Sequence, residues 1–309
     1  MVNGSTTQWA GFNAFLLIFL FFATGILYYK GLITVFETEI ILGIILIFAL
    51  ITIYCKIGDK LTPNGWASIS AILLIIFMVI SGFFAPKGVN YFLVFIIMLV
   101  FFAVLGSLVS GRIAGILIDE RNQMSLSRFQ IVVWTGIILS AYLAMALVRI
   151  AANVPNPLEI GMEWQIWALL GISTVSLVGS PLLLSEKKKK KSDPTEKINL
   201  KTEVAKGDIK IVGLIPVNTS PDAAEFADIF RGDETATLKN INMAKVQMFF
   251  FTIIIALSYG LMIYLMIATN TDPATMDSFP ALDDSLVALL AISHAGYLTN
   301  KSIDQTAKE

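Results

Sequence analysis

The sequence predicts an all-α fold, a polytopic transmembrane helical bundle of about eight spans that contains an internal, parallel duplication of two spans. Three observations predict it. Hydrophobic residues make up 56% of the chain and charged residues only 15%, with a mean hydropathy of +0.76, whereas a soluble domain carries about a quarter charged residues. Apolar runs of spanning length follow one another along the chain, and two of them recur with their polar residues in the same order.

A helix needs about 20 apolar residues to cross a bilayer core, and runs of that kind mark the spans. The opening "MVNGSTTQ" lacks the basic residues of a cleaved signal peptide, so we expect the first run to be a span. The last run is the shortest and most polar, which suits either a complete span or a partly inserted helix. The predicted spans are 9–29, 33–54, 66–84, 89–110, 129–150, 163–184, 245–267 and 285–299.

The distribution of basic residues predicts the orientation. Eight spans with a cytoplasmic N-terminus leave only Lys30, Lys87 and Arg149 of the 22 basic residues on the outer side. Cytoplasmic loops of membrane proteins carry an excess of Lys and Arg. We therefore expect a protein of the prokaryotic cytoplasmic (inner) membrane with both termini in the cytoplasm.

The duplication appears when the sequence is compared with itself. Residues 125–145 align with residues 242–262 at a constant offset of 117, and "ALLGIS" (168–173) aligns with "ALLAIS" (288–293) at an offset of 120. Each copy holds two spans, so both enter the membrane in the same direction and a pseudo-twofold axis along the membrane normal is expected. The matched polar residues are Gln130 with Gln247, Thr135 with Thr252, Tyr142 with Tyr259, and Ser173 with Ser293.

These observations divide the chain into four parts. Residues 1–110 form a four-span N-terminal membrane region, and residues 111–184 form the first membrane repeat. Residues 185–241 are a cytoplasmic linker with a short helix, and residues 242–309 hold the second repeat and the C-terminal tail.

The cytoplasmic linker begins with a run of five lysines, which next to a span generally anchors the topology or contacts anionic lipids. Farther on, "IKIVGLIPV" is β-like, and Ser220, Pro221 and Gly232 delimit a predicted short helix. We expect this helix to dock on the membrane domain or on a neighbouring subunit. The residues predicted to contact lipid or a partner are Lys187, Lys188, Lys189, Lys190, Lys191, Phe226 and Phe230.

The segments "SLSRFQ", "FRGDE", "KVQMFFFT" and "FPALDDSLVALLAISHAGYL" resemble those of bacterial multi-pass membrane proteins with duplicated two-helix repeats. The resemblance covers about residues 115–300. It implies a membrane domain, and it implies no activity or ligand.

Polar residues inside the predicted spans have two interpretations. They either line a path for an ion or small solute between the repeats, or they form the interhelical hydrogen bonds that are ordinary in helical bundles. Ser173, Ser176 and Ser180 recur at a spacing that lets helices pack closely. The candidate positions, for a pore or for packing, are Gln130, Thr135, Tyr142, Ser173, Ser176, Gln247, Thr252, Tyr259, Ser293 and His294.

His294 is the only histidine in the chain and aligns with Thr174 of the first copy. No acidic residue or cysteine lies within helical ligand spacing of it, which argues against a metal site. Its protonation could drive a gating or transport step, because ionisable groups inside a membrane are costly. The alternative is a hydrogen-bonded packing role.

No nucleotide-binding, metalloprotease or hydrolase motif is present, and the chain has one cysteine. We therefore expect no catalytic residues, no metal, no cofactor, no nucleic-acid partner and no enzymatic activity. The predicted function is an oligomeric channel-like or transporter-like protein for an ion or small solute, with a path near the repeat interface. The alternative is a membrane scaffold or sensor that binds a cytoplasmic partner or anionic lipid through residues 186–240. A homo-oligomer is expected in the first case.

Overall fold

The computed structural model describes residues 63–191 and 209–306. The predicted spans 9–29 and 33–54 and residues 192–208 of the predicted cytoplasmic linker lie outside the described residues.

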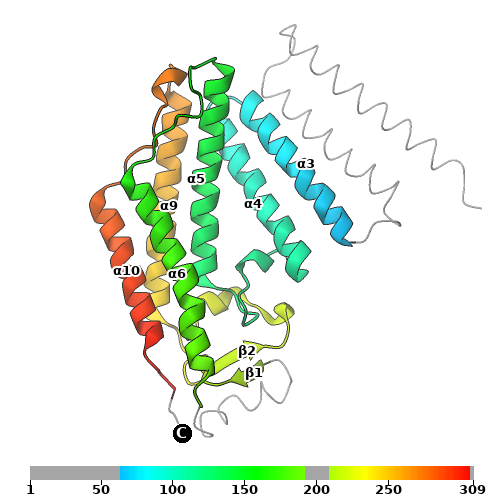
Figure 1. Cartoon of the computed structure of the whole chain (residues 1–309), viewed down its shortest axis with the longest axis vertical. Coiled ribbons are helices and arrows are strands. Elements are labelled where there is room, and N and C mark those ends of the chain that lie inside the picture. Colours follow the sequence, from blue (N-terminus) through cyan, green and yellow to red (C-terminus); the bar gives the residue numbers. More distant parts are fainter. Residues whose placement is uncertain (1–62, 192–208, 307–309) are drawn as a thin grey trace, which may run out of the picture. The chain divides into compact units, whose positions relative to one another are not determined.

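The described chain is mainly helical, as the sequence predicts (Figure 1). Within these residues, four helices (α4, α5, α6 and α9) are long and apolar enough to cross a membrane. By length and composition, these helices are compatible with an integral membrane protein. Helix α10 coincides with the predicted last span and is not among these four. The helices are α3 (Pro63–Phe84), α4 (Val89–Ser110), α5 (Leu126–Ala151), α6 (Trp164–Lys188), α9 (Met243–Thr269) and α10 (Asp284–Ser302).

The chain forms two compact units. The first contains residues up to 108 together with 139–160 and 264–277, and the second contains 109–138, 161–263 and 278–309. The four parts predicted from the sequence are continuous segments of the chain. The two units are not, because α5 and α9 each contribute one section to the first unit and another to the second. All of the site described below belongs to the second unit.

The first unit is organised by one buried asparagine and one buried arginine. The Asn90 side chain accepts hydrogen bonds from the backbone N–H groups of Gly88 and Tyr91, and so caps the start of α4. The Arg149 guanidinium donates to the carbonyl oxygens of Pro157 and Met276 at 3.1 and 2.8 Å. A buried guanidinium needs such acceptors, and here it ties together the loops that follow α5 and α9.

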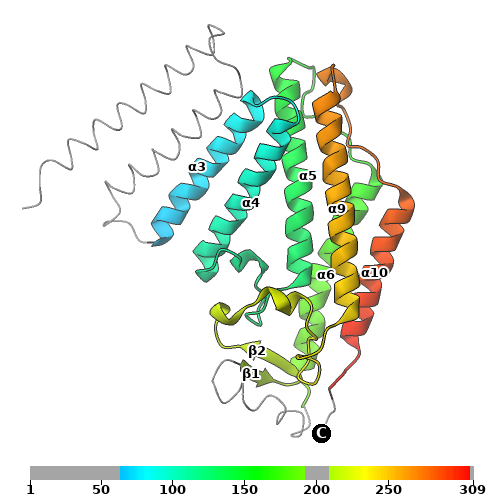
Figure 2. The same ribbon diagram turned by 180° about the vertical axis from the view of Figure 1, so that it is seen from behind.

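In the second unit, residues 209–241, which we call the insert, fold against the ends of the helices. Strands β1 (Ile209–Val212) and β2 (Ile215–Asn218) form an antiparallel hairpin. This hairpin lies beside the C-terminal end of α6 (Figures 1 and 2). The β-like character of "IKIVGLIPV" is therefore confirmed.

The predicted helix between Ser220 and Gly232 begins as expected, with Ser220 as N-cap and Pro221 in the first turn, but its continuation to Gly232 is wrong. The segment forms two short 3₁₀ turns instead, Pro221–Ala223 and Phe226–Ile229. The Asp228 carboxylate accepts from the backbone N–H groups of Glu225 and Met124, and such local bonds compete with a continuous helix. The apolar residues of this segment still pack on the helices, since Phe230 stacks edge-on against Phe249 of α9 at 5.0 Å.

The hairpin turn depends on Gly213. Its φ of +62° lies in the left-handed region, and a Cβ there would come within 2.5 Å of the Lys187 carbonyl oxygen. The next residue, Leu214, donates its N–H to that same carbonyl at 3.2 Å. The glycine therefore allows the turn to approach the end of α6 closely.

We predict that Gly213→Ala detaches the hairpin and lowers stability by about 1–3 kcal/mol, the usual cost of a strained backbone position. The measurement is the thermal transition of the purified protein, together with the rate of proteolysis in the insert. Gly171→Ala in α6 is the control, because a Cβ there meets open space. Equal transitions for the two variants would contradict the prediction.

Candidate functional site

Helices α6 and α10 pack against each other along one seam. The residues buried on α6 recur every three or four positions, and those on α10 do the same except for the adjacent pair Ser293 and His294. This is the spacing of two helices that face each other along their whole length. The buried positions are Ile166, Leu169, Ser173, Ser176, Ser180, Leu184 and Lys187 on α6, and Val287, Leu290, Ser293, His294, Tyr297 and Lys301 on α10.

The seam changes character along its length. The half that begins at Ile166 and Val287 is apolar, whereas the half that ends at Lys187 and Lys301 carries hydroxyls, an imidazole and ammonium groups. Polar groups buried between membrane helices are costly unless they bond to each other. The polar half therefore requires partners, and the structure supplies most of them.

His294 is hydrogen-bonded at both ring nitrogens. Its Nδ1 lies 2.6 Å from Ser176 Oγ of α6, and its Nε2 lies 3.1 Å from Gln130 Nε2 of α5. The same Gln130 amide nitrogen donates to Thr252 Oγ1 of α9 at 2.7 Å. One polar network, which we call the histidine network, therefore joins all four helices of the second unit.

The orientation of Gln130 determines the state of the imidazole. With its NH₂ group toward the ring, His294 Nε2 must be the acceptor, and Nδ1 then carries the hydrogen toward Ser176. Gln130 Oε1 has no hydrogen-bond partner among the described residues, although Gln130 is completely buried. Turning the carboxamide would bring this oxygen to the ring. The neutral imidazole would then carry its hydrogen on Nε2 instead of Nδ1.

The polar side chains continue toward the insert. Ser180 lies one helical turn beyond Ser176, and its Oγ is 3.4 Å from the Tyr297 hydroxyl. Lys301 Nζ donates to that hydroxyl at 2.9 Å and lies 3.2 Å from Asp233 Oδ2 in the insert. The hydroxyl series thus leads from the histidine network to a cluster of charges.

Asp233 is the centre of this charge cluster. Its carboxylate is bound by Arg121 at 2.7 Å, by Lys245 at 2.9 Å and by Lys301 at 3.2 Å, and all four side chains are at most 7% exposed. Arg121 also binds Asp119 at 2.8 Å. The insert carboxylate therefore connects the segment before α5 with α9 and α10.

Electrostatics explain the charge state of Asp233. Burial alone would raise its pKa, but the nearby charges of Lys245, Lys301 and Arg121 hold the pKa of Asp233 well below its usual range. Burial alone would lower the pKa of the Arg121 guanidinium, but the nearby charges of Asp119 and Asp233 raise this pKa above its usual range. Asp233 and Arg121 are therefore both charged at neutral pH.

Glu234, the residue after Asp233, binds helix α6. Its Oε1 pairs with Lys187 of α6, and its Oε2 accepts from the backbone N–H groups of Gln305 and Thr306 at 2.9 and 2.7 Å. Two consecutive carboxylates in the insert therefore contact the ends of α6, α9 and α10 and the C-terminal tail.

The two predicted tyrosines have matching positions outside the histidine network. Tyr142 donates to the carbonyl of Leu158 at 2.9 Å, and Tyr259 donates to that of Pro280 at 3.0 Å. Each carbonyl belongs to the loop that follows the tyrosine's own helix. The duplication of the two helix pairs stays a prediction.

The other predicted positions are distributed as follows. Ser173 and Ser293 are buried in the seam, and Ser293 Oγ has no partner among the described residues. Thr135 is half-buried, and Gln247 is exposed on α9. The matched glutamines therefore differ, because only Gln130 contributes to the network.

The lysine run is largely bound within the chain. Lys187 is buried against Glu234, so it does not face lipid as predicted. Lys188 pairs with Glu120, Lys189 with Glu186 and Lys190 with Asp304. Lys191 is exposed.

Sequence patterns alone do not predict the cluster formed by Asp233, Glu234, Lys245 and Lys301. The sequence feature that could have indicated this cluster is "RGDE", which places two acidic residues in a segment between basic helix ends. Within residues 63–191 and 209–306, no group of three or more His, Cys, Asp and Glu side chains is placed to hold a metal ion.

Comparison with protein families, curated proteins and solved structures gives no match for this chain. The candidate site is therefore interpreted from its own geometry.

We predict that Asp233→Asn costs about 3–5 kcal/mol, because it leaves buried cations without their shared carboxylate. In the wild type, a depressed pKa provides stability above the unfolded-state value of about 3.9, and this stability is lost as pH falls below it. Thermal transitions measured across this pH range check both statements. Asp222→Asn is the exposed control, and an equal effect of the two variants would refute the role of Asp233.

Proposed function

We propose that this integral membrane protein is transporter-like and carries a proton along the polar half of the α6–α10 seam. The observation that carries the proposal is the placement of His294, which bonds at both nitrogens to groups of two other helices. An imidazole held in this way can accept a proton at one nitrogen and release one from the other. Ionisable groups inside a membrane domain generally mark such paths.

Gln130 would control the direction of this exchange. In one orientation its NH₂ group donates to His294 Nε2, and Nδ1–H faces Ser176. In the other, its oxygen accepts from Nε2–H, and Nδ1 can accept from the Ser176 hydroxyl. Turning the Gln130 carboxamide would therefore change which ring nitrogen of His294 can accept a proton, from Nε2 to Nδ1.

The apolar half of the seam would act as the barrier. The polar half ends at Lys301 and the charge cluster, which lie on the cytoplasmic side in the expected orientation. The other half buries Leu169 and Leu290, which offer a proton no acceptor. A path that is polar on one side only suits a gated transporter better than an open channel.

Both predicted repeats contribute to this path. Gln130 and Ser176 belong to the first copy, and Thr252 and His294 belong to the second. A path of this kind is complete within one chain. The homo-oligomer remains a prediction, and the proton path does not depend on it.

The alternative is a scaffold or sensor that acts through the insert. Phe226 favours it, because this ring is 54% exposed although it touches the Phe230 and Phe249 rings. A flux assay separates the two functions. A protein that passes no proton at any tested pH or voltage would remove the transporter proposal and leave the insert as the candidate surface.

We predict that His294→Ala lowers proton flux in proteoliposomes about a hundredfold, the usual contribution of one positioned acid–base group. The rate of internal pH change under an imposed gradient provides the measurement. Thr174→Ala is the matched control, since Thr174 is the aligned residue, is exposed and bonds to a carbonyl of its own helix. Unchanged flux in a folded His294→Ala protein would rule out the path.

We predict that Leu290→Ser increases proton leak several-fold, because it places a hydroxyl in the apolar half of the seam. Leu289→Ser is the control, since Leu289 is 38% exposed and is not one of the buried seam positions of α10. The same pH assay measures both variants without an imposed potential. A leak that rises equally in both, or in neither, would refute the barrier.

A further inference from the structure

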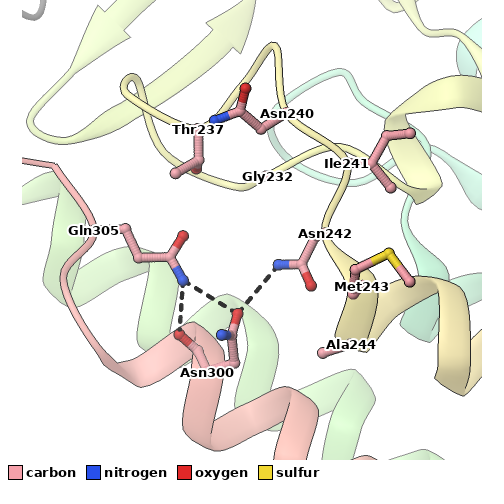
Figure 3. Close-up of a pocket in the computed structure, with 9 residues that line it drawn as sticks. All are labelled: Gly232, Thr237, Asn240, Ile241, Asn242, Met243, Ala244, Asn300 and Gln305. Carbon is pink, nitrogen blue, oxygen red and sulfur yellow. Dashed lines mark hydrogen bonds between the residues drawn. The ribbon is translucent and has the colours of Figure 1, made fainter.

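A pocket of about 310 Å³ lies between the insert, the start of α9 and the end of α10 (Figure 3). Its lining includes four side-chain amides (those of Asn240, Asn242, Asn300 and Gln305), as well as Thr237 and Met243. None of the lining side chains is charged. We call this the amide pocket, and it is separate from the histidine network.

The hydrogen bonds within the pocket leave identifiable groups for a ligand. Asn242 Nδ2 and Gln305 Nε2 both donate to Asn300 Oδ1, at 3.1 and 3.2 Å. Among the described residues, Asn300 therefore keeps its NH₂ group as a donor, and Gln305 keeps its Oε1 as an acceptor (Figure 3). The Asn240 amide, which bonds to none of the other side chains drawn, adds one more donor and acceptor.

This arrangement suits an uncharged ligand that is rich in hydroxyls. Each hydroxyl both donates and accepts, which matches carboxamides that present one group of each kind. A charged headgroup would find no opposite charge among the lining side chains. The volume is at the lower end of the range for small-ligand pockets.

The surroundings indicate where such a ligand would come from. Met243 lines the pocket and is 70% exposed, and it begins a stripe of exposed apolar side chains that continues up α9. The members of this stripe lie on one face of the helix, at intervals that keep them in line. They are Met243, Phe250, Ile254, Leu257 and Leu261.

In a membrane protein such a stripe faces acyl chains. We propose that the amide pocket binds the neutral, polyhydroxylated headgroup of a membrane lipid whose acyl chains lie along the exposed face of α9. This inference does not rest on proton transport, since the pocket and the histidine network share no residue.

Occupancy would also stabilise the insert. Gly232 lines the pocket directly before Asp233, and its N–H donates to the Asn240 carbonyl at 3.1 Å. A Cβ at Gly232 would come within 2.5 Å of Thr237, so this loop is closely packed. A headgroup that bridges Asn240 and Asn300 would therefore hold the loop carrying Asp233 against α10.

The test uses the purified full-length protein, first freed of lipid and then offered defined lipids. Native mass spectrometry counts retained monoglucosyl diacylglycerol, phosphatidylglycerol and phosphatidylcholine of equal chain length. We expect the glucosyl lipid to be retained at least about tenfold better than either phospholipid, as expected for a few additional hydrogen bonds. Free glucose at the same concentration should not compete.

Two variants locate the site. We expect most of the preference for the glucosyl lipid to be lost in Asn300→Leu and in Asn240→Ala. The Asn240→Ala variant keeps the hydrogen bonds to Gly232 and Thr237, because the Asn240 backbone makes them. Gln247→Ala is the matched control, an exposed amide on α9 outside the pocket. The thermal transition verifies that each variant is folded.

Several results would overturn the proposal. They are equal retention of the three lipids, preference for phosphatidylglycerol, full competition by free glucose, or a preference that survives both pocket variants. Proton flux measured in the same liposomes keeps the two proposals distinguishable, since loss of lipid preference leaves the His294 pathway chemically intact.

Discussion

The second unit depends on one buried carboxylate. Asp233 forms ion pairs with Arg121, Lys245 and Lys301, three cations that come from three separate parts of the chain. Buried cations without a counter-charge would be far costlier than the pairs they form here, so the insert is needed for these helix ends to meet. The helices provide the cations and the insert provides the anion, and neither part is electrostatically complete without the other.

This constraint connects the insert to the seam between α6 and α10. Lys301 touches both Asp233 and the Tyr297 hydroxyl, and Tyr297 in turn meets Ser180. The polar half of the seam is thus continuous with the charge cluster, and the histidine network lies at its far end. Ser180 lies one helical turn from Ser176 of the histidine network, so the two polar groups are neighbours along α6.

Periodicity and composition predicted the helical elements well, because spanning length and apolar character are local properties. The helix expected at residues 220–232 failed for a tertiary reason, since Asp228 bonds to the backbone of the segment before α5. A lysine run beside a span is expected to contact anionic lipids, because the negative membrane surface attracts basic clusters. Lys187 departs from that expectation because Glu234, which is distant in sequence, takes it as a partner.

The sequence by itself determined the membrane class, the positions of the described helices and the polar residue types that recur in the two copies. It also showed that His294 is absent from the first copy. Only the tertiary structure decided which polar residues meet. Gln130 reaches His294 while its counterpart Gln247 is exposed, because a helix shows one face to its neighbours and the packing chooses that face. Ion pairs between the insert and the helix ends join residues far apart in the chain, and no local pattern encodes such pairings.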